Sequence, residues 1–175
     1  MSDPKSPCAP FVAELEQEAV ATRKLLERLP ADKLAWKPHP KSQSLGQLAL
    51  HVATTPGIVP GMIAHDRFDI GAVDFTPKQP TSVREIRDAF ESAMAGAKAT
   101  LATWGADDLA KTWRVQNGAQ ELMAMPKAAA LRNLVLNHHV HHRGQLTVYL
   151  RLLDVALPSV YGPSADDNPF APPSR

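Results

Sequence analysis

Residues 127 to 154 read KAAALRNLVLNHHVHHRGQLTVYLRLLD, and this stretch decides the expected fold. Its apolar residues recur every three or four positions, which is the spacing that places side chains on one side of an α-helix. That side holds Leu131, Leu134, Val135, Leu146, Tyr149, Leu150 and Leu153. A long helix with one apolar side needs other helices or a sheet to cover that side.

Three further segments show the same periodicity, at about residues 10–29, 42–65 and 82–103. Pro56 and Pro60 fall inside the second of them and predict a kink or a break there. Four amphipathic helices with little strand signal predict an all-α four-helix bundle. We expect a single domain over residues 1–175, with long loops and an extended C-terminal tail.

Residues 105–126 lack a clear periodicity. Asn117 and Gly118 are typical of a tight turn, so residues 112–115 and 120–123 could pair as a short hairpin. The sequence leaves open whether this region covers a functional site.

The charge and composition exclude some partners. Nineteen Lys and Arg residues against 18 Asp and Glu give a net charge of +1, and no basic stripe offers a surface for nucleic acid. No apolar stretch approaches the ~20 residues that cross a bilayer, and Met1 to Pro10 lack an apolar signal core. A lone cysteine, Cys8, is typical of a reducing compartment. We therefore expect a cytoplasmic protein without a membrane partner.

Several catalytic motifs are missing from the sequence. It has no phosphate-binding Gly-rich loop, no His-Glu-x-x-His and no Gly-x-Ser-x-Gly. No pair of carboxylates with helical spacing lies on an apolar side, which argues against a di-iron centre. The histidines are the remaining unusual feature.

Four of the seven histidines lie between residues 137 and 146. His138 and His142 are four positions apart, so on a helix they lie one turn apart and within about 40° of each other. The same projection places them inside the apolar side. Two buried imidazoles are costly unless something joins them, and a divalent transition metal would do so.

Two ligands rarely suffice for a metal, so a third should come from another helix. His39, His51 and His65 are available, and His51 is the best candidate because it lies in a regular helical stretch. The alternative is that His138 and His142 are core histidines bonded to their neighbours, and the spacing alone leaves both readings open.

The neighbours of this pair fall on other sides of the helix or close to it. His139 and His141 project away from the pair, so we expect them at the surface, at an interface or supporting a ligand. Arg143 is expected to be a solvated or capping cation. Gln145 and Tyr149 project toward the pair, and either could orient a metal ligand or a bound water.

The string Asn137-His138-His139-Val140-His141-His142-Arg143-Gly144-Gln145-Leu146 resembles the DinB family. So do Ser44-Leu45-Gly46-Gln47-Leu48-Ala49-Leu50-His51, Trp36-Lys37-Pro38 and Val160-Tyr161-Gly162-Pro163-Ser164. The resemblance spans nearly the whole chain.

This resemblance implies an up-down-down-up four-helix bundle and a divalent metal, with zinc or nickel expected, held by His51, His138 and His142. Some relatives in the superfamily are thiol-dependent enzymes, which implies a thiol transferase or hydrolase and a low-molecular-weight thiol as a second cofactor. The alternative is a non-enzymatic metal-binding or stress-response protein in which the metal is structural. Family habit also implies a homodimer, while the small-molecule substrate remains unidentified.

Overall fold

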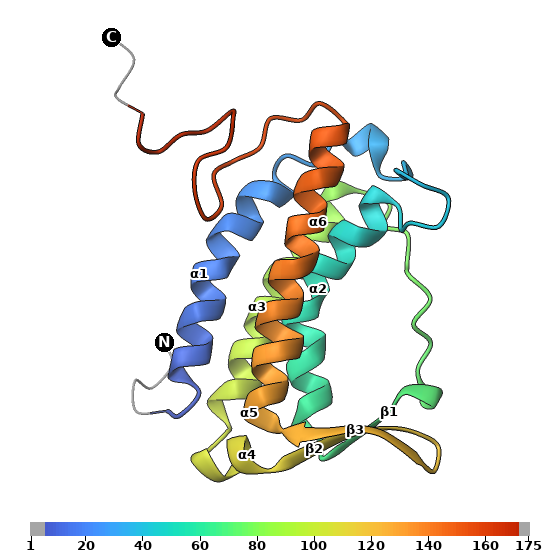
Figure 1. Cartoon of the computed structure of the whole chain (residues 1–175), viewed down its shortest axis with the longest axis vertical. Helices are drawn as coiled ribbons and strands as arrows, with labels where there is room; N and C mark the ends of the chain where they lie inside the picture. Colours follow the sequence, from blue (N-terminus) through green and yellow to red (C-terminus); the bar gives the residue numbers. More distant parts are fainter. Residues whose placement is uncertain (1–5, 172–175) are drawn as a thin grey trace.

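The structure is a computed structural model that describes residues 6–171. Four long helical segments lie side by side: α1 (Ala9–Leu26), α2 (Leu45–Ala64), α3 (Val83–Ala102) and a last run made of α5 (Lys127–Ala130), a π-helical turn η3 (Leu131–Asn137) and α6 (His138–Leu152). The first and last run one way and α2 and α3 run the other, which is an up-down-down-up order (Figure 1). Their ends fall within three residues of the predicted limits. No helix in the described part is long and apolar enough to cross a membrane.

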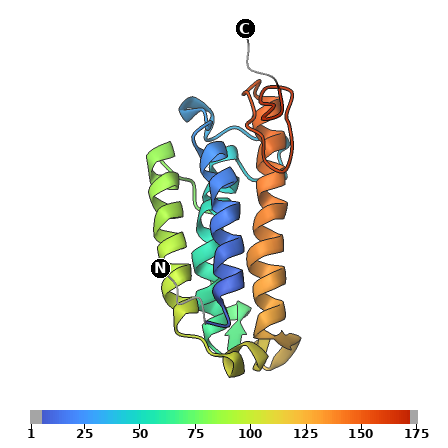
Figure 2. The same cartoon turned by 90° about the vertical axis from the view of Figure 1, so that its left-hand side faces the viewer.

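A small sheet closes one end of the helices, so the all-α prediction is wrong in this region (Figure 2). It consists of β1 (Arg67–Asp69), β2 (Thr112–Asn117) and β3 (Gln120–Pro126), with β2 in the centre. β1 pairs with β2 in parallel, and β2 pairs with β3 as the hairpin that Asn117-Gly118 predicts. Gly118 takes a positive φ of 57°. A tight two-residue turn requires such a φ, and glycine adopts it at little energetic cost because it has no Cβ. Short helical turns η1 (Ala31–Lys33), η2 (Ile70–Ala72) and α4 (Ala106–Ala110) occupy the links.

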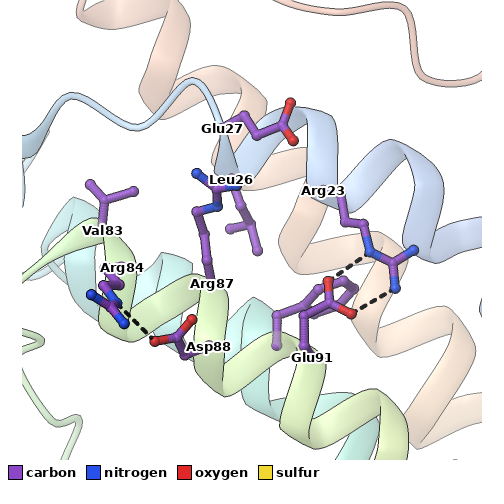
Figure 3. Close-up of a pocket in the computed structure, with 9 residues that line it drawn as sticks. Arg23, Leu26, Glu27, Val83, Arg84, Arg87, Asp88 and Glu91 are labelled. Carbon is purple, nitrogen blue, oxygen red and sulfur yellow. Dashed lines mark hydrogen bonds and ion pairs between the residues drawn. The ribbon is translucent and has the colours of Figure 1, made fainter.

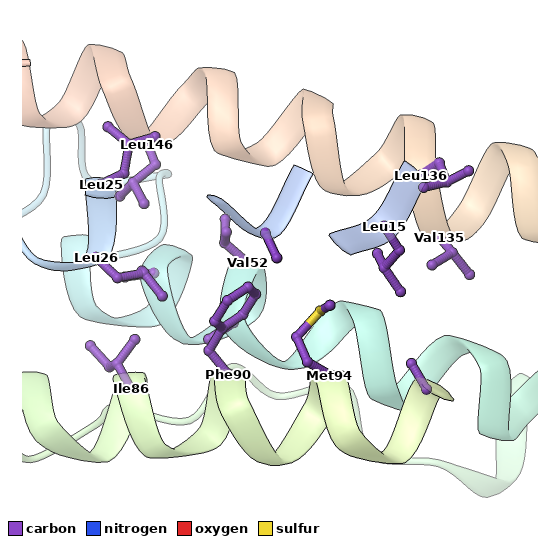
Figure 4. Close-up of a cluster of buried hydrophobic side chains, with 14 of the residues drawn as sticks. Leu15, Leu25, Leu26, Val52, Ile86, Phe90, Met94, Val135, Leu136 and Leu146 are labelled. Carbon is purple, nitrogen blue, oxygen red and sulfur yellow. The ribbon is translucent and has the colours of Figure 1, made fainter. Parts of the chain in front are cut away.

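The core lies between the four long helices, where their apolar sides meet (Figure 4). Leu25 of α1 lies beside Leu146 of α6, and Leu26 lies opposite Ile86 of α3, while Phe90 and Met94 of α3 point into the middle of the same space. α2 is the most enclosed of these helices because α3 and α6 both pack against it. Its start is fixed by Ser44, whose Oγ accepts from the Gln47 N–H while the Gln47 side chain accepts from the Ser44 N–H.

α2 runs without a break through Pro56 and Pro60, so of the predicted kink or break the break is not present. Tertiary packing explains this, because Gly57 lies against the backbone of Ala93, where an added Cβ would come within 2.7 Å of the Ala93 Cα. This contact holds α2 tightly on α3. Pro56 has no N–H, so the carbonyl oxygen of Val52, four residues earlier, loses its normal partner within the helix.

The last helix is turned relative to the sequence projection. Its buried side carries His139, Arg143, Leu146 and Leu150, while the metal-site pair of histidines is only half-buried on the flank. The expectations that His139 and Arg143 project to the surface or into solvent are therefore wrong. Within α6 a rotation of 100° per residue itself places His139 and Arg143 beside Leu146 and Leu150. In the π-helical turn Leu131–Asn137 each residue advances by less than 100°, which moves Leu131 and Val135 toward that same side.

His139 and Arg143 belong to a buried polar cluster that joins α1 to α6. Arg143 is 1% exposed and contacts Glu18 through an ion pair of 2.6 Å, and its Nη1 donates to the Glu18 carbonyl at 2.9 Å. The Thr22 hydroxyl lies 2.9 Å from Nε2 of His139. Tyr161, from the C-terminal tail, donates to Glu18 at 2.8 Å, and its ring lies against the Arg143 guanidinium. We refer to these five residues as the α1–α6 cluster.

We expect Glu18→Ala to lower the free energy of unfolding by about 3 kcal/mol or more, because it leaves the buried Arg143 charge without its counter-ion. Glu14→Ala is the matched control. Glu14 lies one turn away on α1 and forms an exposed ion pair with Arg132, which is worth about 1 kcal/mol or less. Urea unfolding of both variants measures the difference, and equal losses would contradict the assignment of the α1–α6 cluster as a buried pair.

Candidate metal centre

His51, His138 and His142 converge in the structure. Nε2 of His51 lies 3.1 Å from Nε2 of His138, and one potential ligand nitrogen from each of the three rings falls within 4.8 Å of the others. The ring centroids of His142 lie 4.4 Å from those of both partners. One ring comes from α2 and two from α6, and all three are half-buried.

Local structure explains why these rings meet. The Ser44 cap starts α2 at Leu45, which places His51 in its second turn, beside the buried Leu48 and Val52. The π-helical turn ends at Asn137, so His138 and His142 occupy the first turns of α6. α2 and α6 are antiparallel neighbours (Figure 1), and the contacts between the three rings place these positions at the same height.

The three imidazoles are held in the neutral form. Burial, followed by the proximity of His142 and His138, lowers the pKa of His51 to about 4. Burial also lowers the pKa of His138 and of His142. Neutral imidazole is the form that offers a lone pair to a metal ion, so the site needs no further adjustment of charge at neutral pH.

Gln145 selects the proton position on one ring. Its Oε1 lies 2.7 Å from Nδ1 of His142 and accepts the hydrogen bond from that nitrogen. This contact keeps the proton on Nδ1 and leaves Nε2 with a free lone pair. A side chain that bonds the outer nitrogen in this way is typical of histidines that bind metals.

The spacing of the nitrogens fits a transition metal. Zinc–nitrogen bonds of about 2.0–2.1 Å at a tetrahedral angle place two ligand nitrogens about 3.3 Å apart. The 3.1 Å between His51 and His138 is close to that value. Without an ion, two unprotonated Nε2 atoms at this distance would repel each other, so either a shared proton or a cation must lie between them.

The other residues singled out by the sequence lie around the trio. His141 is exposed, with its ring 4.9 Å from that of His142. Tyr149 packs edge-on against Trp36 and donates to the Gln43 carbonyl, which fastens the loop before α2. A direct role at a metal stays a prediction for both. His39 and His65 are not part of the cluster.

A cavity of about 440 Å³ adjoins the trio, with His51 and His138 in its wall. Its floor is the inner face of the sheet, where Phe68, Val115 and Met123 are paired across the three strands. The sequence predicted the hairpin that holds Val115 and Met123 but not their place in the cavity wall, and it did not predict the strand of Phe68. The alternation of polar and apolar residues in Thr112-Trp113-Arg114-Val115 was the available signal.

A second hollow lies between α1 and α3, away from the histidines (Figure 3). It is lined by charged side chains that largely neutralise one another, such as Arg23 with Glu91 and Arg84 with Asp88. Cys8 offers no nucleophile, since it is buried and burial raises the pKa of its thiol. In the described chain, the histidine trio is therefore the strongest candidate for chemistry.

The helical architecture and the three-histidine cluster place the chain in the class of helical proteins with a candidate metal centre. A family model described as DinB family matches residues 1–169, and the chain belongs to the DinB family. The protein named "Uncharacterized protein YrdA" of Bacillus subtilis (strain 168) is 31% identical over 157 residues, covering 90% of this chain and 89% of that protein.

Two solved structures are similar to this one. A DinB-like protein from Bacillus cereus ATCC 10987 is 26% identical with a TM-score of 0.67, covering 86% of this chain and 95% of that chain. A DinB-like protein from Bacillus subtilis (YjoA) is 20% identical with a TM-score of 0.64, covering 83% and 92%. The second likeness concerns the fold alone.

We expect the metal-free protein to lose stability as the pH falls from 6.5 toward 4. A histidine in the unfolded chain has a pKa near 6.5, whereas burial lowers the pKa of folded His51 and His139 to about 4. Above pH 6.5 both states are neutral and this stability is fully present. Below it only the unfolded chain binds protons, so each histidine removes up to about 1.4 kcal/mol per pH unit.

Urea unfolding in EDTA at pH 7, 6 and 5 measures this slope. His139→Gln removes one of these titrations and should make the slope shallower. His39→Gln, at an exposed loop position, is the control and should leave it unchanged. An unaltered slope in His139→Gln would show that this ring is not kept neutral by the fold.

Proposed function

We propose that this protein is a metal-dependent enzyme that binds one divalent transition ion, zinc or nickel, through His51, His138 and His142. The reaction is a thiol transfer or a hydrolysis on a small molecule. The observation that carries the proposal is the trio itself: three neutral imidazoles, no fourth His, Cys, Asp or Glu ligand in the cluster formed by the described residues, and a cavity at its side.

In this proposal the residues around the site have different roles. A divalent ion held by the trio supplies a Lewis acid that lowers the pKa of a water or thiol bound to it. Gln145 holds the His142 ring by its outer nitrogen and so fixes its direction. Because the ligands are neutral, they leave the full positive charge of the ion for the reacting group. The apolar cavity beside His51 and His138 keeps bulk water from that side.

A structural metal is the second candidate. One ion on the trio would tie α2 to α6, and its binding energy would add to the stability of the fold. The half-buried position of the rings, beside a cavity, favours the catalytic proposal over this one. The reaction on a low-molecular-weight thiol, a cytoplasmic location, a homodimer and the absence of a nucleic-acid partner all remain proposals from the sequence.

Substitution of each histidine tests the site. His51→Ala, His138→Ala and His142→Ala should each reduce the metal content from about one ion per chain to nearly none, because two ligands rarely hold a transition metal. His65→Ala, at the exposed end of α2, should keep it. Elemental analysis by mass spectrometry after dialysis against zinc decides this, and full metal content in all three variants would rule the trio out.

Cobalt substitution separates the catalytic from the structural candidate. Co²⁺ in an open three-histidine site should bind 2-mercaptoethanol directly, which produces a sulfur-to-cobalt charge-transfer band in the near ultraviolet and shifts the visible bands. A cobalt spectrum that does not change on addition of thiol, together with a large fall in melting temperature on chelation, would support the structural role instead.

The role of Gln145 is tested separately. Gln145→Ala should weaken metal binding about 10- to 100-fold if the amide orients His142.

A further inference from the structure

The cavity beside the trio has an unusually uniform lining. Apart from His51 and His138, it is built almost entirely from aliphatic, aromatic and methionine side chains of α2, the sheet and the link after it. These are Ile58, Val59, Met62, Phe68, Ile70 and Trp113, joined by residues of neighbouring strands. Because His51 and His138 belong to the lining, a group bound in the cavity can contact the side of the trio that these two rings form.

Polar groups in this wall are few. Thr54 and Thr55 bond their hydroxyls to carbonyls one turn earlier in α2, at Leu50 and His51, so neither hydroxyl proton is offered to a ligand. Trp113 directs its indole N–H to the Met62 carbonyl at 3.3 Å. Asp74 is the single charged residue in the lining, and it lies on the exposed link. A charged or strongly hydrated group would lose its water here without gaining partners.

We propose that this cavity binds an uncharged alkyl or aryl group of the substrate, whose metal-binding end lies on the histidine trio. The inference rests on the proposed metal-dependent function and names the substrate class for that same site. A volume of about 440 Å³ is within the usual range for small-molecule pockets and accommodates a chain of several carbons or a ring.

A neighbouring hollow adjoins the cavity, which gives the substrate a second direction. The residues shared by both are His51, Thr54, Ile58, Asp74 and Phe75. The hollow adds the polar Gln43, Thr76 and Lys78 beside the apolar Leu50 and Pro77. An apolar group gains by lying in the cavity next to His138, and a polar remainder of the substrate can extend toward Lys78.

The link between the sheet and α3 forms the outer wall. Val73 and Phe75 expose 39% and 59% of their surface, and the Phe75 ring packs edge-on against Phe68 at 6.2 Å. Exposed apolar side chains on a link are costly in water, and here they border the mouth of the cavity. An apolar ligand would bury both of them further and so gains contact area beyond the rigid floor.

A series of alkyl hydroxamates tests this inference on the zinc-loaded full chain. Acetohydroxamate, butyrohydroxamate and hexanohydroxamate share one metal-binding head and differ only in the tail. Calorimetry should show that the affinity rises by up to about fourfold for each added methylene. Ile58→Asp places a charge in the wall at a half-exposed position and should abolish this dependence on length, while acetohydroxamate still binds.

Val20→Asp is the matched control. Val20 is 55% exposed on α1 and lies outside the cavity lining, compared with 50% for Ile58, so the two substitutions disturb folding equally little. It should retain the full dependence on tail length. Circular dichroism and zinc content verify that both variants are folded and loaded.

The outcomes separate the inference from the proposed function. Binding of acetohydroxamate without any gain from longer tails overturns the apolar substrate class and leaves the metal centre intact. Failure of every hydroxamate, in protein that holds no zinc, removes the proposed function. In that case 6-bromohexanol still tests whether the cavity binds an apolar group. It should quench the fluorescence of Trp113, with Trp113→Phe as the reference. Absence of this quenching overturns the inference as well.

Discussion

The contact between α2 and α6 at the level of His51 is the constraint on which the site depends. Two Nε2 atoms lie 3.1 Å apart there, and both rings are driven toward the neutral form by burial. Two lone pairs cannot face each other at that distance without a proton or a cation between them. Without a metal, an Nε2–H on one neutral ring can donate to the lone pair of the other. Since both rings are neutral, the same two nitrogens are also able to offer their lone pairs to a divalent ion.

Two contacts attach the sheet and the start of α5 to the end of α2. Trp113 of β2 bonds to the last turn of α2, and Lys127 at the start of α5 donates to the Ala64 carbonyl while its charge pairs with Asp66. Both contacts satisfy carbonyls that the end of a helix leaves unpaired. They also hold the inner face of the sheet beside the histidines. The strands thus supply a hydrophobic floor that four helices alone would leave open to water.

Helical periodicity was sufficient to predict the four long helices, their limits and the pairing of His138 with His142, because those features depend on local sequence. The orientation of the last helix was not predictable in the same way. The π-helical turn displaces Leu131 and Val135 from the positions that a constant rotation gives, so the apolar side drawn through them did not point to the buried Arg143. The continuity of α2 through Pro56 depends on packing against α3. The β2–β3 hairpin was expected from Asn117 and Gly118, whereas β1 has only three residues and shows no alternation of its own.

Pro56 of α2 also affects the position of α6, and through α6 the histidine trio. Its missing N–H leaves the Val52 carbonyl available, and the His139 ring lies near that carbonyl, which opposes the lowering of its pKa by burial. Nδ1 of His139 is buried and has no hydrogen-bond partner among the described residues. On its other edge His139 meets Thr22, so α6 is held between α1 and α2 by one ring. The position next to His139 in sequence is His138. A helix turned so that residue 139 faces the core must present residues 138 and 142 on the flank that borders His51, because they differ from it by about 100° and 60°. The buried polar cluster and the proline in α2 therefore fix the rotation of α6 that the candidate metal centre requires.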